Sequence, residues 1–323
     1  MSVVRPLVCG LDLGGTKLLG LVADQAQDQP LALSKVPAPR GPDAVVDGLV
    51  ALATGLSDQA AAAGDGTVVA VGLGAPGLVD RSGTLRYGPN IAGVVDVPFA
   101  QLLTERLGLP VVVENDATCA AWAEHERGAA RGANHSLTVT LGTGIGAGMT
   151  VKGEILRGAH GYAGEAGHMV VDPNGPRCPC GRRGCWERYA SGSGLGWLAR
   201  EAALAGVASR VVELAGGDPE AVRGEQVTAA AAEGDAQALA VLDKFGWWVA
   251  LGVANLVNVL DSEIVVIGGG LAEAGDLLLD PIRAAYGELV MGASHREPVP
   301  IVQAQLGERA GAWGAALLAA ART

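Results

Sequence analysis

The chain has 323 residues, of which 49% are hydrophobic and 18% charged, with a formal net charge of −11. This length is enough for one large domain or two of ordinary size, and either can bury a substantial core. No apolar run has the length of a membrane span and the first residues lack a signal-peptide core, so we expect a cytoplasmic protein without a membrane partner. The acidic charge argues against nucleic acid as the main partner, and an anionic nucleotide would need a local site of backbone N–H groups and Mg²⁺.

Five cysteines are present, and three of them fall within eight positions, between residues 178 and 185. This spacing fits a reducing compartment and a metal site better than a disulfide framework. The other two, Cys9 and Cys119, lie in a predicted strand and a predicted helix, and we expect them to be small core residues.

The first motif is a glycine turn between two apolar runs, residues 7–12 and 18–22, which predicts a β-hairpin. Glycine lets the backbone approach a ligand closely, and exposed N–H groups in such a turn can bind phosphate. Asp12, at the end of the first strand, could hold Mg²⁺ through water. An ordinary hairpin with a solvated aspartate is the other interpretation of the same residues.

A strand is predicted at residues 31–36, an alanine-rich helix at 43–63 and a buried strand at 67–74. The last of these ends in a loop, and ligands of open α/β sheets gather at such strand ends. Asn90 follows in a loop-like stretch ahead of a helix that begins near Pro98. A loop asparagine is usually a turn residue, so this position alone decides nothing.

Residues 110–114 predict another buried strand, which leads directly through Asn115 and Asp116 into a helix at 117–127. The plain interpretation of Asp116 is a helix N-cap. The functional interpretation is a general base at a strand-to-helix junction. Both are compatible, because the helix N-terminus stabilises the carboxylate and fixes it in place.

A second glycine turn, Gly142, Thr143 and Gly144, follows the strand predicted at 136–141, and a strand-like stretch at 149–155 comes after it. A Rossmann glycine motif must open a helix, so the dinucleotide interpretation fails in this context. Strand, glycine turn and strand repeat the arrangement of residues 7–22, which predicts two phosphate-binding hairpins.

One imidazole and three thiols have the spacing and chemistry of a tetrahedral zinc site; they belong to His168, Cys178, Cys180 and Cys185. A closed set of four ligands leaves no place for water, so we expect a structural zinc; unliganded buried cysteines are the alternative. Glu165 and Glu187 flank this loop. If zinc holds the loop, their carboxylates can accept from sugar hydroxyls, and the second ring nitrogen of His168 can donate to a substrate oxygen.

The rest of the chain predicts an apolar helix at 245–260, a strand at 263–267, a last strand at 299–304 and an alanine-rich helix at 308–320. The strand at 263–267 ends in Gly268, Gly269 and Gly270, a turn at a strand's carboxyl end.

Five motifs in this order resemble the ROK family of bacterial sugar kinases and repressors, most closely its actinobacterial-type ATP-dependent glucokinases. They lie at residues 12–17, 114–116, 142–146, 165–168 and 178–185. The resemblance covers residues 12 to at least 270. It implies an α/β protein with the actin-like ATPase (ribonuclease H-like) fold, with two domains around a cleft. The small domain would comprise residues 1–115, completed by a C-terminal helix at 306–323, and the large domain residues 116–305 with the zinc loop.

By this resemblance Asp116 is the catalytic base of a hexokinase-type reaction, in which glucose and Mg²⁺-bound ATP give glucose 6-phosphate and ADP. The sugar-binding positions are Asn90, Asn115, Asp116, Glu165, His168 and Glu187. The ATP-binding positions are Asp12, Gly14, Gly15, Thr16, Lys17, Gly142, Thr143, Gly144, Gly268, Gly269 and Gly270. The structural Zn²⁺ ligands are His168, Cys178, Cys180 and Cys185.

Several alternatives stay open at this stage. A kinase for another hexose or for an N-acetylated aminosugar is the nearest, because the sequence does not measure the size of the pocket. A sugar-responsive repressor of the same family would carry a helix-turn-helix domain before the first glycine motif, and only eleven residues precede Asp12. A zinc-ribbon interaction module would leave the α/β segments without a role. We expect a homodimer or homotetramer from the family resemblance.

Overall fold

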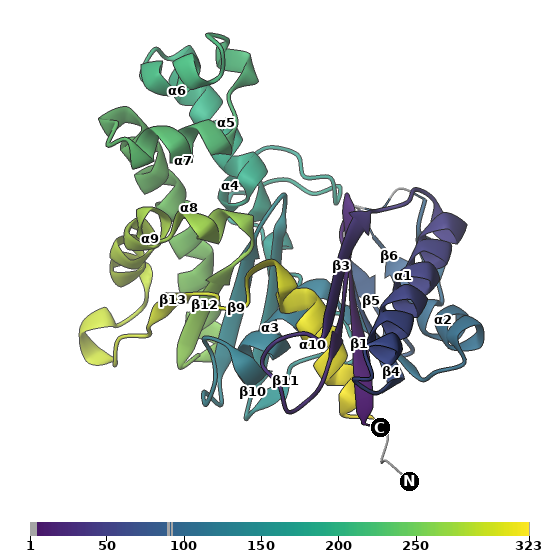
Figure 1. Ribbon diagram of the computed structural model, residues 1–323. Coiled ribbons are helices and arrows are strands. Elements are labelled where there is room, and N and C mark those ends of the chain that lie inside the picture. The colour runs from purple at the N-terminus through teal and green to yellow at the C-terminus, as the bar shows by residue number, and fades with distance from the viewer. Residues whose placement is uncertain (1–4, 89–90, 92, 323) are drawn as a thin grey trace. The chain divides into compact units, whose positions relative to one another are not determined.

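The computed structural model describes residues 5–88, 91 and 93–322 (Figure 1). These residues form two compact units. Unit 1 contains residues Met1–Gly132, Gly148–Gly164 and Leu306–Thr323, and unit 2 contains Ala133–Ala147 and Glu165–Gln305. Unit 1 thus extends beyond the predicted domain boundary at residue 115, although the C-terminal helix returns to it as expected. The domain boundaries themselves stay a prediction.

Unit 1 is built on a five-stranded sheet with the order β3-β2-β1-β4-β8, in which β1, β2 and β3 are antiparallel and β1, β4 and β8 parallel. Its strands are β1 (Pro6–Leu13), β2 (Lys17–Ala23), β3 (Ala32–Pro37), β4 (Thr67–Ala75) and β8 (Val111–Asn115). The predicted hairpin of residues 7–22 is confirmed as β1 and β2. A small antiparallel sheet that the sequence did not predict contains β5 (Leu78–Val79), β6 (Leu85–Tyr87) and β7 (Val95–Val97).

Helices cover both faces of the five-stranded sheet of unit 1, because alternate residues of β1 point to opposite sides (Figure 1). Leu7, Cys9 and Leu11 belong to the core under α1 (Pro42–Ala62) and α2 (Phe99–Leu107). Val8 belongs to the core under α10 (Ala310–Ala320), which packs with α3 (Asp116–Arg127). Asp12 therefore falls on the α10 face. Cys9 and Cys119 are fully buried, which confirms their prediction as core residues.

Two glycines let α10 approach the sheet closely. A Cβ atom added at Gly10 would lie 1.9 Å from the carbonyl oxygen of Ala312, and one at Gly72 would lie 1.8 Å from that of Ala315. Similarly, a Cβ at Gly314 of α10 would lie 1.7 Å from the carbonyl oxygen of Cys119 in α3. The close contact of α3 with α10 explains why unit 1 includes α3 and continues past residue 115.

The second sheet has the order β11-β10-β9-β12-β13, with β9, β12 and β13 parallel. Its strands are β9 (Ser136–Leu141), β10 (Ile145–Val151), β11 (Glu154–Ile155), β12 (Ile264–Gly268) and β13 (Ile301–Gln303). β10 begins in unit 2 and ends in unit 1. The stretch predicted as one strand at 149–155 is instead the end of β10, a turn at Lys152 and Gly153, and β11; both turn residues have positive φ angles.

The helices of unit 2 are α4 (Glu187–Ala190), α5 (Gly192–Leu204), α6 (Ser209–Leu214), α7 (Gly224–Ala232), α8 (Ala236–Leu260) and α9 (Asp276–Leu289). Within this unit, α5, α6 and α7 gather near one end of α8, and α9 packs along α8 (Figure 1). The helix predicted at 245–260 is the second part of α8. Among the described residues α8 is the one helix long and apolar enough to cross a membrane, and 56% of its most apolar window is buried, as in a core helix.

Candidate active site and metal centre

Asp12 lies near the carboxyl end of β1, opposite Gly74 of β4. The absence of a side chain at Gly74 and at Gly311 of α10 leaves room for its carboxylate: a Cβ atom at these positions would lie 3.6 and 2.9 Å from its Oδ1. Burial and, to a lesser extent, the negative charge of Asp116 raise the pKa of Asp12 to about 7, while Lys17 opposes the shift. Two neighbouring carboxylates repel each other when both are ionised, and a bound divalent cation offsets this repulsion. Asp12 and Asp116 therefore have the chemistry of ligands for such a cation.

The first glycine turn joins β1 to β2, and it is closed by a 2.9 Å hydrogen bond from the Gly14 N–H to the carbonyl of Lys17. Gly15, Thr16 and Lys17 are exposed. The Lys17 ammonium donates to Oε2 of Glu308 at 3.1 Å, and Lys35 donates to the same oxygen at 2.6 Å. Glu308, which belongs to no sequence motif, therefore holds Lys17 beside the turn.

Asn115 and Asp116 stand where β8 passes into α3. The N-cap is Asn115, whose Oδ1 accepts from the Thr118 N–H at 3.0 Å, so the expectation that Asp116 caps the helix is wrong by one residue. Asp116 is the first helical residue, and its Oδ1 accepts from the Ala117 N–H at 2.8 Å. Burial raises the pKa of Asp116, and the backbone N–H of Ala117 opposes the shift. Asp116 is thus a fixed carboxylate with an increased affinity for a proton.

Glu114 connects this junction to Arg157, a residue that the sequence did not mark as functional. Its Oε1 accepts from the Asn115 N–H at 3.1 Å, and its Oε2 accepts from Nε of Arg157 at 2.6 Å. The Glu114 side chain is only 10% exposed, so its charge needs this partner. Arg157 lies in a loop, 43 positions from Glu114 in the sequence, so no local pattern of residues predicts this pair.

Asn90, predicted to bind sugar, lies outside the described residues. The side chain amide of Asn115 donates to the carbonyl of Gly77 at 3.1 Å, so this asparagine holds the loop after β4 as well as capping α3.

In unit 2, the second glycine turn lies between β9 and β10. The Gly142 N–H donates to the Gly144 carbonyl at 3.0 Å, and the Gly142 carbonyl accepts from the Gly192 N–H at 2.7 Å. Ser193 Oγ also donates to the Thr143 carbonyl at 3.4 Å. The first residues of α5 therefore brace this turn.

Glu187 is the first residue of α4, and it lies directly beside the same turn. Its Oε2 accepts from the Ile145 N–H at 3.1 Å, and a Cβ atom at Gly144 would lie 2.3 Å from that oxygen. Its Oε1 lies 4.0 Å from Sγ of Cys178. Glu187 therefore touches both the glycine turn and the predicted metal ligands, a link that the sequence did not show.

The triple glycine begins with Gly268, the last residue of β12, which lies opposite Thr140 of β9. Gly269 has a φ of 81°, and a Cβ atom there would lie 2.5 Å from the carbonyl oxygen of Leu141, the last residue of β9. Gly270 faces open space. Both predicted ATP-binding turns of unit 2 thus begin at the ends of adjacent parallel strands.

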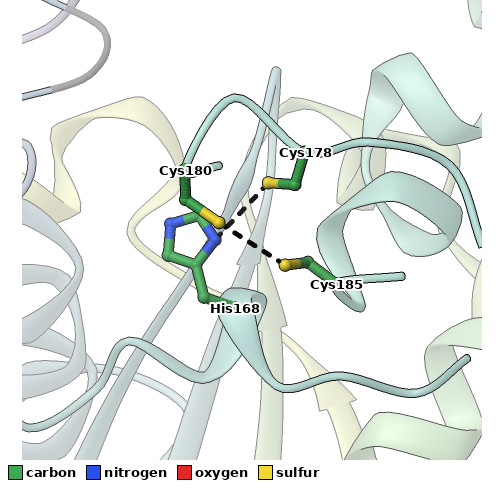
Figure 2. Close-up of side chains that lie close together, drawn as sticks. All are labelled: His168, Cys178, Cys180 and Cys185. Carbon is green, nitrogen blue, oxygen red and sulfur yellow. Dashed lines mark hydrogen bonds between the residues drawn. The ribbon is translucent and has the colours of Figure 1, made fainter. Parts of the chain in front are cut away.

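The four predicted metal ligands converge in unit 2, as Figure 2 shows, and their ligand atoms all lie within 4.8 Å of one another. His168 Nδ1 is 3.8 Å from Sγ of Cys178, and the sulfur atoms of Cys180 and Cys185 are 3.6 Å apart. A tetrahedron with Zn–S bonds of about 2.3 Å has edges of about 3.8 Å. The donor set and its size therefore fit a four-coordinate soft metal ion with no further open position.

Backbone pairing and buried aromatic rings hold this loop. Cys185 forms an antiparallel bridge with Val170, and Cys178 donates its N–H to the Arg182 carbonyl at 2.8 Å. Trp186 is fully buried and donates from Nε1 to the Trp248 carbonyl of α8 at 2.7 Å. Tyr189, stacked on Trp248 at 4.1 Å between centroids, donates its hydroxyl to Asp172.

Glu165 and His168 lie together at a short 3₁₀ helix, Ala166–His168. Oε2 of Glu165 is 3.8 Å from Nε2 of His168, the nitrogen that does not face the cysteines. A carboxylate near the free nitrogen of a metal-bound histidine fixes its tautomer and orientation. Within unit 1 the structure therefore groups Asp12, the first glycine turn, Asn115 and Asp116. Within unit 2 it groups the other two glycine turns, and it places Glu187 and Glu165 around the Cys₃His cluster.

Comparison with known proteins agrees with these features. The family model described as the ROK family matches residues 8–322. Glucokinases of Streptomyces coelicolor and Thermotoga maritima are 40% identical over 316 residues (97% of each chain) and 36% identical over 309 residues (95% of each chain). A solved ROK family glucokinase from Streptomyces griseus, in complex with glucose and AMPPNP, is 37% identical with a TM-score of 0.87, covering 98% of this chain and 99% of that one. These matches confirm the predicted actin-like ATPase fold class. Because the match spans nearly all of its residues, this chain belongs to the ROK family.

Proposed function

We propose that this protein is an ATP-dependent glucokinase, which transfers the γ-phosphoryl group of ATP to the 6-hydroxyl of glucose. The observation that carries the proposal is the position of Asp116: a carboxylate with a raised pKa at a helix N-terminus, beside Asp12, in a chain whose relatives from Streptomyces coelicolor and Thermotoga maritima are glucokinases. The relative from Streptomyces griseus, which was solved with glucose and AMPPNP, supports the same pair of substrates.

In the proposed mechanism Asp116 accepts the proton of the 6-hydroxyl as that oxygen bonds to the γ-phosphorus. The bond from the γ-phosphorus to the β,γ-bridging oxygen breaks, and ADP leaves. Phosphoryl transfer depends more on positioning than on proton affinity. Asp116 meets this need, because its Oδ1 is held by the Ala117 N–H while the raised pKa favours uptake of the proton.

The phosphate-binding groups in this proposal are the glycine turns. Gly14, Gly15 and Thr16 form one turn, with Lys17 beside it, and Gly142, Thr143 and Gly144 form the other. Exposed backbone N–H groups in such turns suit phosphate oxygens. Asp12 would hold Mg²⁺ through water, and Mg²⁺ supplies charge neutralisation on the triphosphate when bound. The residues Gly268, Gly269 and Gly270 would lie against the adenosine.

The sugar would be bound by Asn90, Asn115, Glu165, His168 and Glu187, with a structural Zn²⁺ held by His168, Cys178, Cys180 and Cys185. Zinc in this proposal has no part in the chemistry, because all four positions of a tetrahedral ion are taken by protein. Its role is to keep Glu165, His168 and Glu187 in place with little entropy to lose on binding. The homodimer or homotetramer and the domain division at residue 115 belong to the same proposal.

A sugar panel tests the substrate. The purified protein with Mg²⁺-bound ATP is assayed with glucose, mannose, fructose, N-acetylglucosamine and N-acetylmannosamine, and ADP formation is measured. We expect the highest kcat/KM with glucose. A higher kcat/KM with an N-acetylated aminosugar overturns the glucokinase assignment, and no ADP formation with any sugar overturns the kinase assignment.

A further inference from the structure

We infer that unit 1 contains a second ligand site, a pocket for a small phosphate-bearing anion, built around Arg81, Arg157 and Arg322. The three arginines line a cavity of about 310 Å³ together with Asp80, Glu114 and Val113. All of these residues belong to unit 1, and no residue proposed above to bind ATP or sugar lines the cavity. A volume of this size accommodates a small metabolite.

Two of the guanidinium groups are held in place by part of their N–H groups and keep the others for a ligand. Arg157 uses Nε for Glu114, which leaves its two terminal nitrogens without a partner among the described residues. Arg81 donates from Nε to the Ala159 carbonyl at 3.0 Å and from Nη2 to the Gly158 carbonyl at 2.6 Å, which leaves Nη1. Preorganised guanidinium forks of this kind recognise phosphate through paired N–H···O bonds.

The charges in the pocket favour an anion. The pocket contains three arginines and two carboxylates. One of these, Asp80, already accepts hydrogen bonds from the Ser82 and Thr84 N–H groups and pairs with Arg86, which does not line the pocket, at 2.7 Å. Glu114 balances one arginine. Arg322, near the end of α10, has no ion pair among the described residues. A local positive excess is notable in a chain with a net charge of −11.

The edge strand of the sheet forms one wall of the pocket. β8 is the last strand in the order β3-β2-β1-β4-β8, and its residues Val112 and Val113 line the cavity.

The pocket is also coupled to the proposed sugar site, a point that rests on the proposed function. Arg157 donates to Glu114, and Glu114 accepts from the Asn115 N–H beside Asp116. An anion that takes hydrogen bonds from Arg157 weakens its hold on Glu114. Binding at the pocket therefore changes the apparent affinity for glucose.

Binding is tested without ATP or glucose, so its outcome does not depend on kinase activity. Isothermal titration calorimetry at constant ionic strength measures binding of inorganic phosphate and, separately, of glucose 6-phosphate. We expect phosphate to bind with a Kd of about 1 mM or tighter, and Arg81→Gln and Arg322→Gln each to weaken it by about tenfold. Tighter binding of the ester than of phosphate, if Arg81→Gln and Arg322→Gln weaken it, would identify a phosphorylated sugar as the occupant of the pocket. Equal weakening of phosphate and ester binding by these variants would identify the phosphate group alone as the recognised part.

The matched control is Arg106→Gln, which removes an arginine of α2 that pairs with Asp47 outside the cavity. Arg322 makes no ion pair among the described residues, so we expect Arg322→Gln to fold like the wild type. No binding to the wild type, or equal binding to the wild type and to the double variant Arg81→Gln/Arg322→Gln, overturns the site. Phosphate that binds at the arginines but leaves the KM for glucose unchanged overturns the coupling alone.

Discussion

The backbone N–H of Ile145 donates a hydrogen bond of 3.1 Å to Oε2 of Glu187, whose other carboxylate oxygen lies 4.0 Å from Sγ of Cys178. A single side chain thus connects the second glycine turn with the Cys₃His cluster. If the turn binds phosphate and the cluster binds zinc, Glu187 links nucleotide binding to the metal loop.

Glu187→Gln tests this link. The amide keeps the shape of the side chain but is a weaker acceptor, and a hydrogen bond to a charged group contributes about 1.5 to 3 kcal/mol. We expect kcat/KM for glucose to fall by roughly ten- to a hundredfold, and the KM for ATP to rise with it. The matched control is Glu201→Gln, an exposed glutamate of α5. An unchanged KM for ATP would show that the contact with Ile145 does not support the turn.

Cys180→Ser should release zinc, because serine is a poor ligand for a soft metal ion and a three-ligand site binds it weakly. Metal content measured by atomic absorption should fall from about one zinc per chain to near zero. Glucose binding should weaken as Glu165 and His168 lose their support. Cys9→Ala, a substitution in the core of unit 1, is the control and should retain its zinc. Full zinc content in Cys180→Ser would disprove the ligand set.

Asp116→Asn removes the proposed base without changing the size of the side chain. A positioned general base contributes roughly 10²- to 10⁴-fold, and we expect kcat to fall by that factor while glucose still binds. In the wild type, kcat/KM should decline on the acid side at a pH above the ordinary range for aspartate, since burial raises the pKa of Asp116 and only the ionised form accepts a proton. Asp58→Asn, on the exposed side of α1, is the control. Turnover close to wild type in Asp116→Asn would refute the assignment.

Asp12→Asn should stabilise the protein at high pH in the absence of added Mg²⁺. The pKa of Asp12 is about 7 in the folded chain and near 3.8 in the unfolded chain, so the folded state loses stability as the pH rises from 4 to 7. An amide does not ionise and avoids this loss. We expect a gain of about 1 to 3 kcal/mol in the free energy of unfolding at pH 8, reduced by partial access of water to the carboxylate.

The measurement is the difference in Tm between Asp12→Asn and the wild type at pH 5 and at pH 8. The difference should be larger at pH 8, and the variant should lose kinase activity because it lacks the proposed Mg²⁺ group. A difference that does not grow with pH would contradict the raised pKa of Asp12.

Gly72→Ala and Gly55→Ala form a matched pair within unit 1. The new methyl group at Gly72 would lie 1.8 Å from the Ala315 carbonyl oxygen, so α10 must move away from the sheet, at a cost of more than about 3 kcal/mol. At Gly55, an exposed position of α1 with nothing within 4 Å, alanine should stabilise the helix by about 1 kcal/mol. Urea unfolding of both variants measures the two effects. A mild effect at Gly72 would mean that α10 does not pack as closely as described.

The local elements that bear the site could be predicted because their information is local. Two strands around Gly14 and Gly15 predict a hairpin, and a buried strand followed by Asn115 predicts the start of a helix. The Cys₃His cluster could be predicted for the same reason, since metal ligands within one loop can be recognised from their residue types and spacing. Less was predictable for residues 188–235, where α4 and α6 have only four and six residues, too few for a helical period to repeat. The cap assignment failed by one residue, because either Asn115 or Asp116 has the chemistry of a cap and only the backbone at Thr118 distinguishes them.

By itself, the sequence determined the class of the protein, the glycine turns, the candidate base and the candidate metal ligands, all of which depend on residues within a few positions of one another. Only the tertiary structure decided which distant residues share an environment. Gly74 and Gly311 make space for the Asp12 carboxylate, Glu308 pairs with Lys17 across 291 positions, and Arg157 reaches Glu114. These pairings follow from strand register and from the approach of α10 to the sheet. Neither leaves a periodic pattern along the chain, because each depends on contacts between segments far apart in sequence.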